Sequence, residues 1–197
     1  MIYLTGDIHG EVKYIKRFCM LYQPRPTDCI ILLGDVGANY FLDYRDSQRK
    51  TTLNGFGVPI LCIHGNHEQR PAGIPSYKMK EWNGGQVWYE EEYPNLLFAK
   101  DGEIYTIAGK RFIAIGGAYS VDKQYRILQN LGWWPDEQPS DEIKRYVEEQ
   151  LSLNEVDYVL SHTCPFRYEP IEKFLPIVDQ STVDKSTEMW LGQIEAN

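Results

Sequence analysis

The sequence predicts an α/β fold, a four-layer α-β-β-α sandwich in which two packed mixed sheets lie between outer helices. In residues 1–70, short aliphatic runs alternate with helical patterns, which is typical of parallel strands joined by right-handed crossovers. From residue 86 onward, short strand patterns follow one another, and a second, mostly antiparallel sheet is expected to pack on the first. A chain of 197 residues is long enough for one sizeable core, so we expect a single domain over residues 1–197.

Three runs in the first third of the chain have the composition of strands buried on both faces. They are Ile2–Thr5, Cys29–Leu33 and Val58–Ile63, in which aliphatic side chains do not alternate with polar ones. Between them, Glu11–Tyr22 carries apolar residues at helical spacing, and Phe41–Leu53 is a more polar helix candidate. This strand-helix-strand order predicts neighbouring parallel strands whose carboxyl ends point the same way.

The later part of the chain predicts more strands and one long helix. Arg70–Gly85 is rich in Pro and Gly and is expected to be an irregular loop that covers the site. A helix is predicted over Asp141–Leu153, with Ser140 as its N-cap. The strand candidates are Gln86–Tyr89, Leu96–Ala99, Ile104–Ile107, Arg111–Ile115 and Asp157–His162.

Polar side chains follow each predicted N-terminal strand directly after a glycine. Asp7 and His9 follow the first strand, Asp35 follows the second, and Asn66 and His67 follow the third. Because ligands collect outside the carboxyl ends of parallel strands, we expect these residues to converge. Carboxylates and imidazoles suit divalent metals, and a dinuclear centre needs a bridging carboxylate. Asp35, which lies between the other two groups, is the natural bridge.

These motifs resemble those of the calcineurin-like metallophosphoesterases. Gly6-Asp7-Ile8-His9-Gly10 matches the family's GDxHG block, and Gly34-Asp35 matches its GD block. Gly65-Asn66-His67-Glu68 matches its GNHE block, and Ser161-His162 matches its strand-end histidine. One block alone would be weak evidence, but four blocks in the family's order are strong evidence.

The resemblance implies a role for each matching residue. Asp7 and His9 would bind the first metal, Asp35 would bridge, and Asn66 and His162 would bind the second metal. His67 would face the substrate and protonate the leaving group, so His67 and Asp35 are the catalytic candidates. The implied function is metal-dependent phosphoester hydrolysis, as a phosphatase or phosphodiesterase, with a dinuclear centre and a metal-bound hydroxide. The two divalent ions could be Mn, Fe, Zn or Ni, and manganese is the ion to add in an assay.

The sequence departs from the family pattern in two places. The family closes its site with a C-terminal Gly-His-x-His block, and the residues after His162 contain no histidine. Truncation, substitution by carboxylates and an incomplete site would each explain this, and we favour a domain that lacks its C-terminal end. The carboxylates available there are Glu169, Glu172, Asp179, Asp184 and Glu188. The alternative function is therefore a catalytically incomplete member of the fold that acts as a binding or scaffolding module.

The second departure concerns phosphate binding. The protein-phosphatase branch has an arginine shortly after its GD block, and residues 36–39 contain none. Arg70 is the candidate replacement, alongside Asn66 and His67 as substrate contacts. We interpret His64 as structural or as a support for the ligands, and Glu68 as an orienting partner or helix-start acid. Arg126 is interpreted as a surface residue, with a place in the substrate cleft as the alternative. Four aromatic residues could stack a nucleobase, although core packing is the more typical role: Trp82, Trp88, Tyr89 and Tyr93.

Composition narrows the partners and the location. The chain is 43% hydrophobic and 24% charged, as in ordinary globular proteins, and its net charge of −8 argues against bulk nucleic-acid binding. No apolar run reaches the roughly 18 residues of a membrane span, and the first residues lack the features of a secretory signal. Four dispersed cysteines are typical of reduced thiols in a cytoplasmic protein. The expected substrate is a phosphorylated small molecule, a nucleotide or a phosphoprotein.

Overall fold

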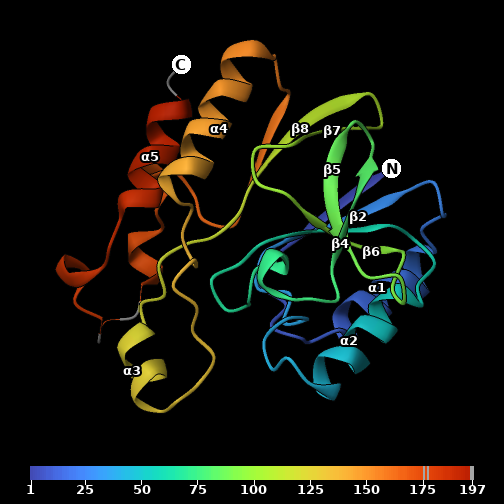
Figure 1. Ribbon diagram of the computed structural model, residues 1–197, viewed down its shortest axis with the longest axis horizontal. Helices are drawn as coiled ribbons and strands as arrows, with labels where there is room; N and C mark the ends of the chain where they lie inside the picture. The colour runs from blue at the N-terminus through green and yellow to red at the C-terminus, as the bar shows by residue number, and fades with distance from the viewer. Residues whose placement is uncertain (175, 177, 196–197) are drawn as a thin grey trace.

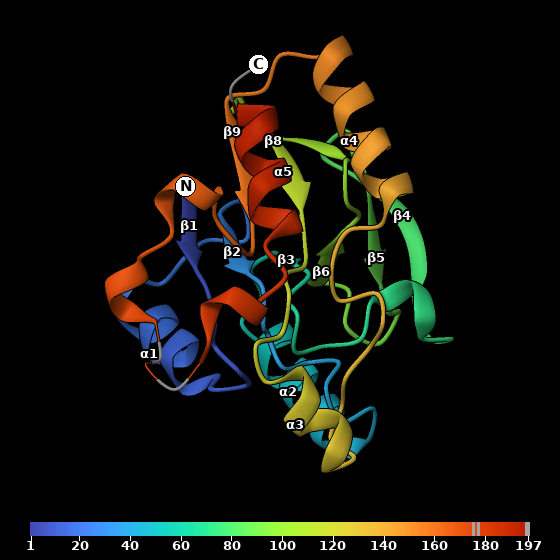
Figure 2. The ribbon, with the colours of Figure 1, turned by 90° about the vertical axis from the view of Figure 1, so that its left-hand side faces the viewer.

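Two sheets lie face to face between helices in the computed structural model, which describes residues 1–174, 176 and 178–195. Helices α1 (Lys13–Tyr22) and α2 (Tyr44–Asn54) cover the outer face of the larger sheet. Helices α4 (Asp141–Leu153) and α5 (Ser186–Glu195) cover the outer face of the smaller sheet (Figures 1 and 2). The predicted four-layer sandwich of two mixed sheets is therefore confirmed.

The larger sheet has six strands in the order β1-β2-β3-β6-β5-β4. Its first four strands are parallel, and β5 and β4 join antiparallel at the far edge. The bounds are β1 Ile2–Thr5, β2 Cys29–Leu33, β3 Ile60–Ile63, β4 Lys78–Trp82, β5 Gly85–Tyr89 and β6 Leu96–Ala99. The three strands predicted before residue 70 thus lie side by side, as the strand-helix-strand order predicted.

The smaller sheet has three strands in the order β7-β8-β9. They span Ile104–Ile107, Lys110–Ile115 and Tyr158–Ser161. The hairpin of β7 and β8 is antiparallel, whereas β9 returns through α4 and runs parallel to β8. Ser140 caps α4 as predicted, because its hydroxyl accepts a hydrogen bond of 3.2 Å from the Ile143 N–H.

Three elements were not predicted. The expected irregular loop Arg70–Gly85 contains the strand β4, so that prediction was wrong over Lys78–Trp82. Its polar sequence is that of an edge strand, and the signal that could have found it is the Asn83-Gly84 turn, where both residues have positive φ. The helices α3 (Lys123–Leu128) and α5 also lie in segments with no predicted element. Short 3-10 turns occupy Pro71–Gly73, Phe166–Tyr168, Ile171–Lys173 and Gln180–Thr182.

Three layers of apolar side chains hold the sandwich together. One lies under α1 and α2, where Ile15 and Leu53 pack on the larger sheet, and another lies between the sheets around Leu61 and Phe112. The third is formed where Val147 and Trp190 pack on the outer face of β8. Within the described residues, no helix is long and apolar enough to cross a membrane.

The register of the parallel strands brings their carboxyl ends to one edge. Thr5 pairs with Leu32, and Leu33 pairs with Ile63, so the residues that follow β1, β2 and β3 emerge at the same level. The last residue of β9, Ser161, pairs with Ile115 in the second sheet. The residue after it, His162, reaches the carbonyl oxygen of Leu33 at the end of β2. Both sheets therefore contribute to one site.

Tyr105 joins the two sheets through a buried hydroxyl, which donates to Gln86 O at 2.7 Å and accepts from Lys100 N at 3.0 Å. We expect Tyr105→Phe to lower the free energy of unfolding by about 1–3 kcal/mol, since two backbone groups lose their partner. Denaturant unfolding would measure this change. Tyr44→Phe, at a position that is 68% exposed, is the control and should change stability by less than about 0.5 kcal/mol. Equal effects of the two substitutions would contradict this account.

Candidate metal centre

Three of the predicted ligands lie in strained turns at the strand ends. Asp7, His9 and Asp35 have φ values of 48°, 43° and 45°, in the left-handed region that non-glycine residues rarely adopt. The turns support one another, because His9 N–H donates to the carbonyl oxygen of Asp35 at 2.8 Å. Strain of this kind clusters at functional sites, where surrounding structure holds the chain in place.

Asp35 lies at the middle of the site and is 4% exposed. Its Oδ1 accepts a hydrogen bond of 2.9 Å from the backbone N–H of His67 and lies 3.6 Å from His162 Nε2. Its other oxygen, Oδ2, lies 3.6 Å from His9 Nε2. One carboxylate therefore presents one oxygen to each side of the site, which is the arrangement that a bridging ligand requires.

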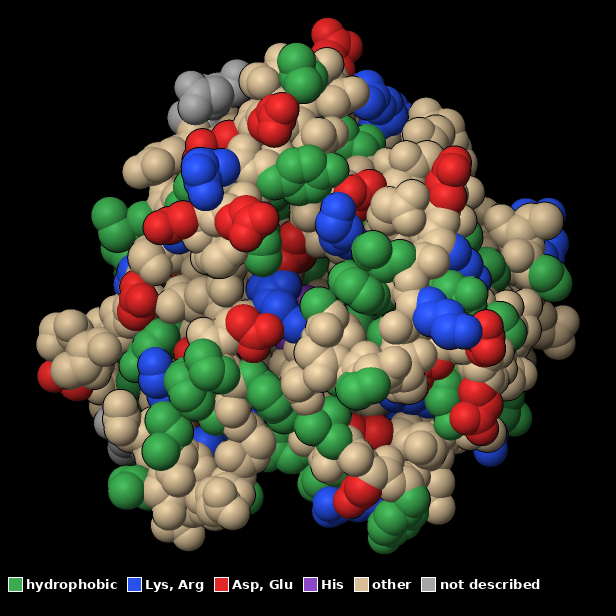
Figure 3. All heavy atoms as spheres, in the orientation of Figure 1, with side chains coloured by type: hydrophobic (Ala, Val, Ile, Leu, Met, Phe, Trp, Pro, Cys, Tyr) green, Lys and Arg blue, Asp and Glu red, His purple; other side chains and the backbone are tan. Residues whose placement is uncertain are grey.

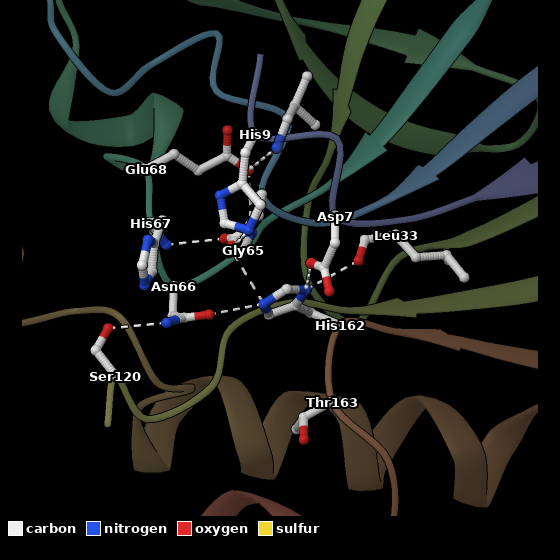
Figure 4. A network of polar contacts seen from close by, with 12 residues as sticks. Asp7, His9, Leu33, Gly65, Asn66, His67, Glu68, Ser120, His162 and Thr163 are labelled. Carbon is white, nitrogen blue, oxygen red and sulfur yellow. Dashed lines mark hydrogen bonds and ion pairs between the residues drawn. The ribbon is translucent and has the colours of Figure 1, made fainter. Parts of the chain in front are cut away.

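The side chains form two groups that share Asp35. One consists of His9, Asp35 and His67, and the other consists of Asp7, Asp35 and His162; within each group the candidate ligand atoms lie within 4.8 Å of one another. Figure 4 shows His162 directed between Asp7 and Asn66, and the His9 and His67 rings on the other side of the site. The predicted residues from four strand ends are thus brought together.

His162 shows that the second group fits a cation. Its Nδ1 lies 2.9 Å from Leu33 O and can only donate there, so Nε2 carries the lone pair in the neutral ring. With the Asn66 amide oriented as in Figure 4, that nitrogen faces Asn66 Oδ1 at 2.7 Å and Asp35 Oδ1 at 3.6 Å. Three acceptor atoms directed at one another repel unless a positive charge lies among them. A divalent cation or a second proton on His162 would supply that charge.

The glycines of the motifs are required by close approach. A Cβ at Gly34, where φ is 92°, would overlap the imidazole of His162, and a Cβ at Gly65 would overlap Asp35 Oδ1 and its backbone nitrogen. Any side chain at either position would therefore displace a candidate ligand. The GD and GNHE patterns are explained by packing as well as by chemistry.

Glu68 supports the turns that carry the ligands. It is 1% exposed, and Oε1 accepts hydrogen bonds from Gly65 N at 3.1 Å and Val36 N at 3.4 Å. Burial, with a further contribution from Asp35, raises the pKa of Glu68 to about 8. The side chain thus ties the turn after β3 to the turn after β2, in line with its predicted orienting role.

The structure gives Arg70 a different environment from the predicted substrate contact. Its guanidinium pairs with Asp101 and donates from Nε to Asp136 O at 2.7 Å, and Arg70 does not line the cleft beside the metal groups. The carboxylates after His162 do not complete the site either. In the part of the chain that the structure describes, none of them belongs to the two ligand groups; Glu169 pairs with Lys185, and Glu188 accepts from Thr163.

A cleft of about 230 Å³ opens beside His9 and His67, and its other lining residues are Gly37, Tyr40, Phe41 and Arg49. Arg49 comes from α2, and its Nη1 donates to Gly37 O at 2.7 Å. It is the basic residue of this cleft. Arg49 belongs to none of the sequence motifs, so the sequence did not predict it as a site residue. It reaches the cleft because α2 packs against the turn at Gly10.

Two further polar residues beside the site were missed or misread. Asp122 Oδ1 lies 3.5 Å from His67 Nε2, on a segment that had no predicted structure. Arg126, predicted to lie on the surface, is instead 2% exposed and donates to Ser120 Oγ, which also accepts from Asn66 Nδ2. Only the tertiary fold reveals the contacts of Asp122 and Arg126. Burial is the main cause that lowers the pKa of His67, while the negative charge of Asp35 opposes this shift.

The comparison with protein-family models agrees with the motifs. The model of the calcineurin-like phosphoesterase family matches residues 1–179. No curated protein matches the chain. Among solved structures, the chain resembles a protein of unknown function from Aquifex aeolicus, with 14% sequence identity, a TM-score of 0.39, and coverage of 81% of this chain and 76% of that one.

The raised pKa of Glu68 predicts how the stability of the metal-free protein depends on pH. The folded state holds a proton up to about pH 8 that the unfolded state releases near its usual 4.5. The stabilisation is therefore complete below that lower value and is lost as the pH rises toward 8, by at most about 1.4 kcal/mol per pH unit. Denaturant unfolding with chelator, from pH 5 to 8, would measure it. Glu68→Gln should remove this slope; an identical slope in both proteins would contradict the assignment.

Proposed function

This chain belongs to the calcineurin-like phosphoesterase family, and we propose that it hydrolyses phosphoesters with two divalent cations held at the strand ends. The observation that carries the proposal is the position of Asp35, whose two oxygens face separate ligand groups at 3.6 Å each. If Asp35 only formed a turn, it would need neither a histidine beside each of its oxygens nor the left-handed backbone at Asp7 and His9.

The proposed ligands follow the order of the motifs: Asp7, His9 and Asp35 would hold one cation, and Asp35, Asn66 and His162 would hold the other. In the two geometric groups, Asp7 lies with His162 and His9 lies with His67, so the motif order and the geometry assign Asp7 to different cations. When bound, the cations acidify water and neutralise charge on the phosphoryl oxygens, which removes the need for a basic protein surface. We favour manganese as the first metal to test, because mixed nitrogen and oxygen ligands suit it.

His67 is the proposed acid for the leaving group. Its side chain is 28% exposed and lines the cleft, so a substrate can reach it. Asp122, 3.5 Å from its Nε2, orients the ring and opposes the burial that lowers the pKa of His67. Because His67 also lies within reach of His9 and Asp35, a role as metal ligand is the competing assignment. Metal content of a His67 variant separates the two.

The cleft supports a small phosphoester as substrate. Its volume of about 230 Å³ is enough for a phosphoryl group and a compact leaving group. Arg49 would contact the phosphoryl oxygens, and Phe41 and Tyr40 would contact the leaving group. A nucleotide or a phosphoprotein would extend beyond this cleft, so a phosphorylated small molecule is the first class to test.

The alternative is a binding or scaffolding module that keeps the fold without turnover. The observation that favours it is the size of the ligand groups, since the described residues offer three side chains of metal-ligating type per group. This alternative predicts weak or no metal binding and no hydrolysis. The experiments below decide between the two.

We expect the purified chain to bind divalent metal and to hydrolyse a chromogenic phosphomonoester or phosphodiester when Mn²⁺ is added. Asp35→Asn should lose both metal and activity, because each ligand group loses its shared carboxylate. His67→Ala should keep its metal and lose about 10²- to 10⁴-fold in kcat, the usual contribution of a general acid. Metal analysis and steady-state kinetics would measure these effects.

Asp157→Asn is the matched control, because Asp157 precedes β9 at the end opposite His162 and pairs with Lys110 instead. It should keep both metal and activity. If the unaltered chain hydrolyses the substrate no faster than Asp35→Asn and binds no stoichiometric metal, the proposed enzymatic function is wrong and the binding-module alternative is retained. Loss of metal in His67→Ala would make His67 a ligand.

Arg49→Ala should lower kcat/KM by about 10- to 100-fold, since a charge-assisted hydrogen bond contributes about 1.5–3 kcal/mol. Arg49→Lys should recover part of the loss, because the charge remains while the planar fork is lost. Arg17→Ala, at an exposed position on α1, is the control for removing one positive charge. Unchanged kcat/KM in Arg49→Ala, with metal retained, would remove Arg49 from the substrate site.

A further inference from the structure

A second and larger cavity lies apart from the metal groups. It has a volume of about 660 Å³ and is enclosed by α4, the end of β6, Trp88 of β5 and the 3-10 turn that begins at Pro71. Figure 3 shows the hollow near the middle of this face, with acidic and basic side chains around it. None of the metal-ligand candidates lines it.

Apolar and aromatic groups form most of its wall. Trp88 and Tyr146 contribute ring surfaces, and Ile143 and Ala99 contribute aliphatic surface. Tyr146 is held in place because its hydroxyl donates to Glu103 Oε1 at 2.9 Å and its ring packs against Gly102, where φ is 83°. A wall of this kind suits a flat ring system that can pack against aromatic faces.

Two residues that line this cavity carry buried polar atoms without partners. His64 is 3% exposed and lines the cavity, and neither of its ring nitrogens has a hydrogen-bond partner among the described residues. Arg70 Nη2 is also buried without a partner, although Nη1 pairs with Asp101 and Nε donates to Asp136 O. Leaving such groups unpaired is unfavourable, so their presence beside a cavity points to a ligand that pairs with them.

The donor and acceptor atoms of Arg70 and His64 limit which edge of a ligand can bind beside them. Arg70 Nη2 offers an N–H, and neutral His64 offers one N–H and one lone pair, with the tautomer free to suit the ligand. Adenine carries an acceptor and a donor, N7 and the N6 amino group, on adjacent positions of its N7 edge, whereas guanine carries two acceptors, N7 and O6. Either edge matches this set, because the tautomer of His64 decides whether its ring donates or accepts. Glu142 and Glu149 of α4 also line the cavity and can accept hydrogen bonds from hydroxyl groups.

The charges argue against an anionic ligand. Arg70 is neutralised by Asp101, and Lys100 lies 3.0 Å from Glu103. Arg145 lines the cavity together with Glu142 and Glu149, so an added phosphate would meet two carboxylates for one remaining cation. An uncharged ligand with hydroxyl groups fits these surroundings better.

We propose that this cavity binds a purine nucleoside, with the base between the Trp88 and Tyr146 walls, its N7 edge on His64 and Arg70, and its sugar hydroxyls on Glu142 and Glu149. The site is separate from the phosphoester site and does not depend on hydrolysis. A nucleoside contains no phosphoester bond, so its binding can be measured independently of catalysis.

Calorimetric titration with adenosine and guanosine, in the presence of chelator, tests the proposal. We expect saturable binding of one nucleoside per chain and no binding of inorganic phosphate. His64→Phe should weaken binding about tenfold or more, the equivalent of one buried hydrogen bond. Without nucleoside, the same variant should melt at an unchanged or higher temperature, because an unpaired imidazole is replaced by an apolar ring of similar shape.

Ala72→Trp is the second variant, since Ala72 is exposed and lines the cavity, and a large side chain there should block nucleoside entry. Ser76→Trp, in the same connection but outside the cavity lining, is its matched control and should bind normally. Trp88→Leu should also weaken binding by about fivefold or more through lost stacking.

Three results would overturn the proposal. The first is the absence of saturable binding by either nucleoside. The second is unchanged affinity in both His64→Phe and Ala72→Trp. The third is binding that requires a 5′-phosphate and disappears in Asp35→Asn, which would place the ligand at the metal groups. Failure of hydrolysis with intact nucleoside binding would affect only the proposed function.

Discussion

The site depends on the close approach of Asp35 to the turns on either side of it. Its carbonyl oxygen accepts from His9 N–H, its Oδ1 accepts from His67 N–H, and the chain can come this close only because Gly65 has no side chain. The carboxylate is buried and surrounded by imidazoles rather than by cations of the protein. Such a group is stable in a folded protein when positive charge is supplied to it, which is the physical basis of the inferred metal centre.

The end of β3 serves two regions of the molecule. His64 lines the larger cavity, whereas Asn66 reaches the metal groups. The segment after β8 connects the two regions, since Gly117 N–H donates to His64 O at 2.8 Å and Ser120 Oγ accepts from Asn66. One short connection therefore contacts both the candidate ligand-binding cavity and a candidate metal ligand.

Much of the fold and part of the site could be predicted from the sequence. β2, β6, β7 and α4 have the predicted bounds, because the strands are short, largely apolar runs and α4 has apolar residues at helical spacing after its N-cap serine. β4 was missed because an edge strand has little apolar content. The metal-ligand candidates follow from motif order, whereas Arg49, Asp122 and Arg126 are brought to the site by helix packing and by segments without a local signal.

The sequence by itself determined the parallel strands, the family motifs and the set of polar residues at the strand ends, because strand composition and glycine turns are local properties. Only the tertiary structure decided which oxygen of Asp35 faces which histidine, that Arg70 faces the second cavity, and that His64 is buried without a partner. Those outcomes depend on the distances between segments far apart in the chain. They follow from how the two sheets pack, which no local pattern specifies.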